Sequence, residues 1–123
     1  MSAKQEILKL ERQQVRDVNA HRIGRVVQDF DTRFVGFSST RHARIIGRRA
    51  LAETFRYYLR RARKLRYRIA QPRVEVHGDT AVVTFYWTVE LGPGRRVRGR
   101  GTHVFVRRGR AWRIVHEHFS RAH

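Results

Sequence analysis

Three side chains of this sequence could transfer a proton: His103, Glu117 and Tyr58. His103 stands in an alternating stretch next to Phe105, which predicts a strand with the imidazole on its apolar face. An imidazole in a pocket can donate or accept a proton near neutral pH, or anchor an anion. A hydrogen-bonded core histidine is the simpler interpretation. None of the three belongs to a fixed catalytic signature, so they are weak catalytic candidates and the sequence leaves enzyme activity open.

The direction of the Glu117 side chain depends on the register of the last strand. If Glu117 and Phe119 face the same side as His103, Glu117 is the only carboxylate predicted near the imidazole and is a candidate base. If the turn at Gly109 has no bulge, the alternate residues of the strand face the His103 side instead, and Glu117 faces solvent or an interface. The residues of the opposite parity are Trp112, Ile114, His116 and His118. The sequence leaves both arrangements open.

Metal and thiol chemistry receive little support. His116 and His118 are two residues apart on one predicted strand, so their side chains share a face. They could hold a metal if a neighbouring strand supplied a third ligand, but packing or an interface network is the simpler interpretation. The chain has no cysteine, which excludes a disulfide, a thiolate zinc site and a cysteine nucleophile. We predict neither a metal nor a cofactor.

The charge is the most unusual property of the chain. Lys and Arg number 28 against 10 Asp and Glu, the net charge is +18, and 25 of the 28 basic residues are arginine. Such a field attracts polyanions. The candidate polyanion contacts are Arg60, Arg61, Arg63, Arg98, Arg100 and Arg108. Few aromatic residues interleave with them, so base-specific readout is not predicted, and an arginine-biased or engineered surface is the simpler interpretation.

These residues must be positioned by helices that precede strands. Apolar periodicity predicts helices over 7–18, 23–30 and 47–62, with Ile7, Val15 and Val18 on the buried side of the first helix and Asp17 on its solvated side. Tyr58 and Phe55 share the apolar stripe of the third helix. Residues 34–37 are strand-like, and period-two alternation predicts strands near 67–69, 74–76, 81–91, 97–106 and 112–119.

The longest predicted hairpin shows which residues share a face. Pairing Leu91 with Val97 places Trp87 and His103 on one apolar face. Gly99 and Gly101 fall on that face too, where a missing side chain leaves room for curvature or a ligand, so we expect a hollow there.

Helices followed by an antiparallel meander predict one α+β domain over residues 1–123. No apolar run is long enough to span a membrane, so we expect a soluble, cytoplasmic protein.

The C-terminal third resembles a known superfamily. The turn G-D-T-A at 78–81 and the ending G-T-H-V-F-V-R-R-G-R-A-W-R-I-V-H-E-H-F-S resemble the nuclear transport factor 2-like (NTF2-like) superfamily, nearest its SnoaL or polyketide-cyclase-like branch. The opening K-Q-E-I, Gly47 before the third helix and W-x-x-V-H-x-H-x-S from Trp112 to Ser120 are similar to the association (hub) domain of calmodulin-dependent kinases. The resemblance covers nearly the whole chain. It implies a cone-shaped, cystatin-like fold, with a curved antiparallel sheet packed against the N-terminal helices.

The resemblance also implies a deep pocket between sheet and helices, a dimer through the sheet and, in association domains, larger rings. Hub pockets are often lined with arginines, and this chain has Trp87, His103 and Phe119 at the corresponding positions, a departure from that pattern. The expected ligand-binding residues are Phe55, Tyr58, Trp87, His103, Glu117 and Phe119.

Three functions fit these observations. The leading hypothesis is a non-catalytic domain that binds a small apolar or anionic ligand and self-associates. The second is a small acid/base enzyme of the ketosteroid-isomerase or polyketide-cyclase type, because the same fold hosts such chemistry. The third is a nucleic-acid or polyanion binder, natural or engineered, that acts through its outer arginines.

Overall fold

The computed structural model describes residues 1–122, in which three helices precede most of a six-stranded sheet. The helices are α1 (Ala3–Asn19), α2 (Ile23–Gln28) and α3 (Gly47–Arg61). The strands are β1 (Phe30–Phe37), β2 (Ile45–Ile46), β3 (Arg66–His77), β4 (Thr80–Gly92), β5 (Arg95–Arg108) and β6 (Ala111–Arg121). The second helix ends two residues earlier than predicted, because Phe30 joins β1 and lies opposite Ile114 of β6.

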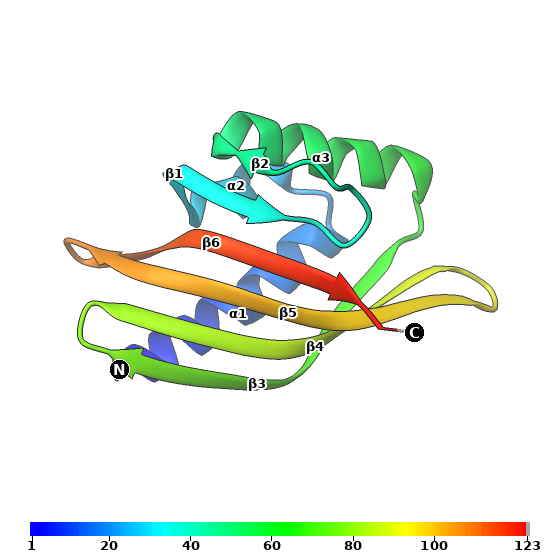
Figure 1. Cartoon of the computed structure of the whole chain (residues 1–123). Helices are drawn as coiled ribbons and strands as arrows, with labels where there is room; N and C mark the ends of the chain where they lie inside the picture. The colour runs from blue at the N-terminus through cyan, green and yellow to red at the C-terminus, as the bar shows by residue number, and fades with distance from the viewer. Residues whose placement is uncertain (123) are drawn as a thin grey trace.

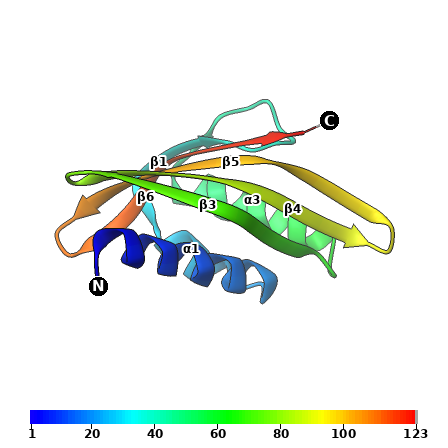
Figure 2. The same ribbon diagram turned by 90° about the horizontal axis from the view of Figure 1, so that it is seen from below.

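The sheet has the order β2-β1-β6-β5-β4-β3 (Figure 1). All neighbours are antiparallel except β1 and β6, which run parallel, so the predicted α+β fold is confirmed with one parallel pair in a mixed sheet. Helices α1 and α3 lie on one face of the curved sheet, and no helix formed by residues 1–122 covers the opposite face (Figure 2). None of the helices formed by residues 1–122 is long and apolar enough to span a membrane.

Helix α1 buries polar side chains together with apolar ones. It begins at Ser2, whose hydroxyl accepts the backbone N–H of Gln5 while the Gln5 side chain accepts that of Ser2, a capping box. Its buried residues are Ile7, Glu11, Gln14, Asp17 and Val18. The prediction that Asp17 faces solvent is wrong, because its carboxylate is buried and accepts from the Gln13 side chain and from Arg22.

The pairing of β4 with β5 differs from the predicted register but keeps the predicted faces. In the β4–β5 hairpin Val97 lies opposite Val89 and not Leu91, because the ladder is irregular between Glu90 and Gly92. A shift of two residues preserves the side-chain parity, so the faces of Trp87 and His103 are as predicted.

Strand β6 carries one residue more than β5 between two consecutive pairs. Val104 lies opposite His116 and Phe105 opposite Ile114, which leaves Val115 as a bulge. The bulge reverses the parity of β6, so that Ile114 before it and Glu117 after it are both buried. The two alternatives left open by the sequence therefore each describe half of the strand.

The glycines of β5 make room for aromatic rings. A Cβ atom on Gly101 would lie 2.6 Å from the Phe85 ring and 3.2 Å from the Phe119 ring, and one on Gly99 would lie 2.4 Å from the Trp87 ring. The expectation that these glycines leave a hollow is wrong, because bulky rings from β4 and β6 occupy the space.

We expect Gly101→Ala to lower the free energy of unfolding by about 1–3 kcal/mol, since the added methyl overlaps the Phe85 ring. Phe85→Leu alone is also destabilising, but the double variant should be more stable than the sum of the two single effects implies. Chemical denaturation of the four proteins measures this coupling. If the two single changes in unfolding free energy simply added in the double variant, the Phe85 ring would not be the group that occupies the space beside Gly101.

Candidate functional site

A histidine between two carboxylates lies at the centre of the protein. The Nδ1 of His103 is 2.8 Å from Glu11 Oε2 and 3.0 Å from Glu11 Oε1, while its Nε2 is 2.6 Å from Glu117 Oε1. The side chains of His103 and Glu11 are 1% and 2% exposed, and that of Glu117 is 11% exposed. We call these three residues the interior triad.

The geometry keeps the imidazole charged. Burial favours the neutral ring, but the two carboxylates outweigh it and raise the pKa of His103 from 6.5 to about 10. With both nitrogens protonated, the ring donates to Glu11 and to Glu117 at neutral pH. The interior triad therefore carries two carboxylates against one imidazolium, and the His103 ring has no lone pair left to accept a proton.

Each member of the triad comes from a different element. Glu11 projects from α1 toward the sheet, His103 stands on β5, and Glu117 lies opposite His103 on β6 because of the bulge at Val115. Sequence reasoning missed Glu11. The signal was present, because Ile7, Glu11 and Val18 have the i, i+4, i+11 spacing of one helix face.

Aromatic rings pack around the imidazole of His103. The rings of Phe30, Phe85, Phe105 and Phe119 lie with their centroids 5.1–6.1 Å from that of His103. Trp87 stacks on Phe119 at 5.8 Å and donates its indole N–H to the Arg100 carbonyl. Four of the six expected ligand-binding residues, Trp87, His103, Glu117 and Phe119, thus contact one another.

The other two expected ligand-binding residues lie on α3. Tyr58 bonds through its hydroxyl to the Ser38 and Thr40 hydroxyls in the loop after β1, and none of its hydrogen bonds reaches the triad. Phe55 is partly buried and packs against the core. The three catalytic candidates are therefore not brought together, since only His103 and Glu117 are in contact.

Two further acidic residues, Asp29 and Asp31, lie at the N-terminal end of β1, which begins at Phe30. Burial raises the pKa of Asp29 from 3.8 to about 6, against the opposing attraction of Arg113. Asp31 accepts from the Arg33 amide and from Arg108, and these two contacts hold its pKa below the ordinary value. Arg108, a predicted polyanion contact, is thus paired with Asp31 at 3.0 Å.

The other predicted polyanion contacts are exposed, and none takes part in an ion pair within residues 1–122. They are Arg60, Arg61, Arg63, Arg98 and Arg100. Arg61 lies over the Tyr57 ring at 4.2 Å, a cation–π contact. Arg98 and Arg100 belong to the outer sheet face. Arg60 lies on the side of α3 that faces α2, and Arg63 lies just beyond the end of α3.

The two histidines of β6, His116 and His118, face away from the interior triad. His116 Nδ1 is 2.8 Å from the Val35 carbonyl oxygen, and the His118 ring lies 5.4 Å from that of Phe37. Within residues 1–122, no group of three His, Asp or Glu side chains has an arrangement that could hold a metal ion.

Comparison with known proteins places the fold. The family model for the SnoaL-like domain matches residues 7–123. This chain belongs to the SnoaL-like domain family. A search of curated proteins found no significant match to this SnoaL-like chain.

Solved structures of similar fold come from several bacteria. An NTF2-like protein of unknown function from Pseudomonas putida has a TM-score of 0.90 at 21% identity, covering 96% of this chain and 85% of its own. A proposed calcium/calmodulin dependent protein kinase II association domain from Xanthomonas campestris has a TM-score of 0.82 at 19% identity, covering 99% and 89%. A proposed ketosteroid isomerase from Parabacteroides distasonis has a TM-score of 0.78 at 21% identity, covering 98% and 89%. At these identities the likeness establishes the NTF2-like, cystatin-like fold alone.

Proposed function

We propose that this SnoaL-like chain is a non-catalytic, self-associating domain of the cytoplasm that binds a small apolar or anionic ligand. The observation that carries the proposal is the state of the interior triad. His103 is protonated and donates both of its N–H groups, Glu117 accepts one of them, and aromatic rings surround the imidazole. A general base needs a free lone pair within reach of a substrate proton. The doubly protonated imidazole has none, and the Oε1 atom of Glu117 already accepts a charge-assisted hydrogen bond from His103.

The outer face of the sheet supports self-association. Val82 and Val104 lie opposite each other there, and Tyr86, which is 55% exposed, lies opposite Arg100. In the described part of the chain, residues 1–122, no helix covers this face (Figure 2). Burying an exposed tyrosine and neighbouring valines against a second copy removes apolar area from water. The arginines beside Tyr86 repel their counterparts in such a dimer, so salt should strengthen it.

Light scattering on a sizing column tests self-association. We expect the wild type to have about twice the chain mass of 14.7 kDa, or a higher closed multiple, at about 0.15 M and 1 M salt. Tyr86→Glu should yield the monomer mass, because it buries a charge in the interface. The matched control is Tyr57→Glu, at an exposed tyrosine of α3, and it should keep the wild-type mass. A monomeric wild type at both salts would refute self-association, as would a Tyr86→Glu protein of unchanged mass.

The unpaired surface arginines favour polyanion binding as a second candidate function. Five of the six predicted contacts have no carboxylate partner within residues 1–122. The ratio of absorbance at 260 nm to that at 280 nm, recorded across the same column peaks, shows whether nucleic acid is bound to the protein. Nucleic acid carried at the lower salt and shed at the higher salt would support it, because phosphate contacts weaken steeply with salt.

A further inference from the structure

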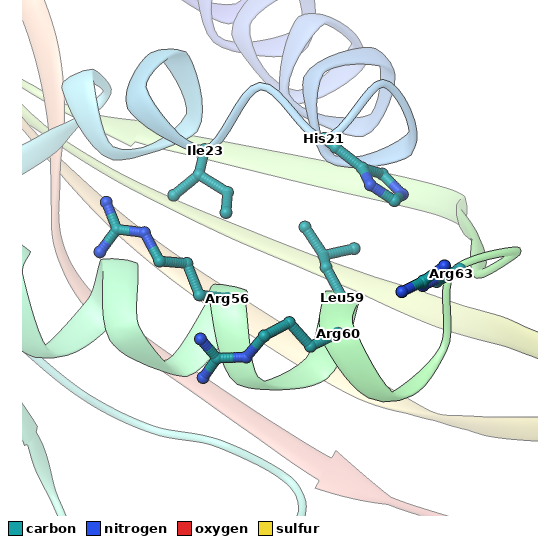
Figure 3. A pocket seen from close by; sticks show the side chains of 6 residues that line it. All are labelled: His21, Ile23, Arg56, Leu59, Arg60 and Arg63. Carbon is teal, nitrogen blue, oxygen red and sulfur yellow. The ribbon is translucent and has the colours of Figure 1, made fainter.

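A hollow outside the cone interior lies where α3 faces the start of α2 (Figure 3). It has a volume of about 450 Å³ and is lined by His21, Ile23, Arg56, Leu59, Arg60 and Arg63. That volume is within the range of about 300–1,000 Å³ typical of small-molecule sites. None of the interior triad or the expected ligand-binding residues lines it.

The hollow has an apolar centre and cationic ends. Ile23 of α2 and Leu59 of α3 point toward each other across it, with Arg56 and Arg60 on one side and His21 and Arg63 on the other (Figure 3). The arginines stand at i, i+4 and i+7 from Arg56, with Arg63 just beyond the end of α3, so they follow one side of the helix. No carboxylate lines the hollow.

The guanidinium groups of the hollow are not used by the fold. The ion pairs within residues 1–122 all involve other side chains, and no hydrogen bond of Arg56, Arg60 or Arg63 side chains occurs within them. Three cations that line one hollow without a counter-charge repel one another. An anion placed between them would relieve that repulsion and accept charge-assisted hydrogen bonds.

The backbone at one end of the hollow is also unusual. His21 joins α1 to α2 with a φ of 60°, in the left-handed region that non-glycine residues seldom occupy. That conformation places the imidazole at the Arg63 end of the hollow (Figure 3). The imidazole adds a hydrogen-bonding group to the cationic lining.

We propose that this hollow binds an organic anion, a small molecule with a carboxylate, sulfonate or phosphate group on an apolar body. The guanidinium groups would take the anionic head, and Ile23 and Leu59 would contact the apolar body. The inference rests on the ligand-binding part of the proposed function and is independent of self-association.

The fluorescent sulfonate 8-anilinonaphthalene-1-sulfonate is the probe, because it joins an anion to an aromatic body. We expect saturable binding to the wild type, and Arg56→Gln/Arg60→Gln should raise the Kd at least about tenfold, since two charge-assisted contacts are lost. The matched control, Arg12→Gln/Arg16→Gln, removes two exposed arginines at the same i, i+4 spacing from α1. It should change the Kd by less than about twofold.

Two further probes separate the parts of the ligand. Neutral N-phenyl-1-naphthylamine should bind the wild type at least about tenfold more weakly than the sulfonate, because it lacks the anion. Methanesulfonate, which has the head group without the apolar body, should not displace the fluorescent probe at equal concentration. Far-ultraviolet circular dichroism confirms that each variant is folded, and its light-scattering mass should equal that of the wild type.

The proposal is overturned if the wild type does not bind the sulfonate, or if both double variants lose affinity equally, which would indicate surface charge alone. It is also overturned if Arg56→Gln/Arg60→Gln binds the sulfonate probe with the wild-type Kd. Displacement of the probe by methanesulfonate would overturn it too, because that would indicate an adventitious ion only. A variant that keeps its oligomer mass but loses the probe separates this site from self-association. A Tyr86→Glu protein of monomer mass that still binds the probe with the wild-type Kd would show that this site does not depend on self-association.

Discussion

Replacing His103 by leucine is expected to lower the free energy of unfolding by about 3–5 kcal/mol at neutral pH. The substitution removes the imidazolium that lies between Glu11 and Glu117 and leaves two buried carboxylates facing each other. Each uncompensated charge pays its desolvation cost without a partner, and the two also repel one another. Guanidinium denaturation followed by circular dichroism, at one fixed protein concentration, measures the loss.

A compensated variant shows whether charge is the cause. Glu11→Met/His103→Leu/Glu117→Leu replaces the whole interior triad by apolar side chains, and we expect it to recover most of the stability lost in His103→Leu. The control is His42→Leu, at an exposed histidine, with a change within about 0.5 kcal/mol. If the triple variant were less stable than His103→Leu, packing and not charge would explain the loss.

Stability is expected to fall as the pH rises from 6.5 to 9.5. The pKa of His103 is about 10 in the folded chain against 6.5 when unfolded, so the folded state holds this proton more tightly. Its contribution is complete below pH 6.5, where both states are protonated, and is lost as the pH rises through 10. The fall over this range is on the order of 3 kcal/mol, because one pKa unit corresponds to about 1.36 kcal/mol.

Urea denaturation at a series of pH values checks this dependence. The raised pKa of Asp29, about 6 against 3.8, acts with the same sign but at lower pH, so it does not account for a fall above pH 6.5. Burial raises the pKa of Tyr67 well above 10, which places its ionisation beyond the range as well. His103→Gln should have a much flatter profile. A wild-type profile that is flat or rises from pH 6.5 to 9.5 would contradict a protonated His103.

The hydrogen bonding and burial of the interior triad distinguish the binding hypothesis from the enzyme hypothesis. A ketosteroid-isomerase-type or dehydratase-type site needs an acid or base that a substrate can reach, whereas Glu117 bonds to His103 and aromatic rings enclose the imidazole. The arginine-lined hollow between α2 and α3 lies elsewhere, and none of the interior triad lines it. The proposal of a non-catalytic binding domain rests on this difference.

The sequence by itself determined the fold class and the face of His103. Period-two alternation is insensitive to a slip of two residues, so Trp87 and His103 share the inner face although Val97 pairs with Val89 and not with Leu91. The helices were recognisable because their apolar residues repeat at helical spacing, and the ending from Trp112 to Ser120 identified the superfamily.

The tertiary structure alone decided what surrounds His103. The parity of β6 depends on a bulge at Val115, a single extra residue that no local pattern announces. The pattern of an amphipathic helix places a charged residue such as Glu11 in solvent, because burying a charge requires a compensating partner and the neighbouring sequence does not show one. For Glu11 that partner is His103, ninety-two residues away. Likewise, Gly101 indicates space, but only the rings of Phe85 and Phe119 determine that the space is filled.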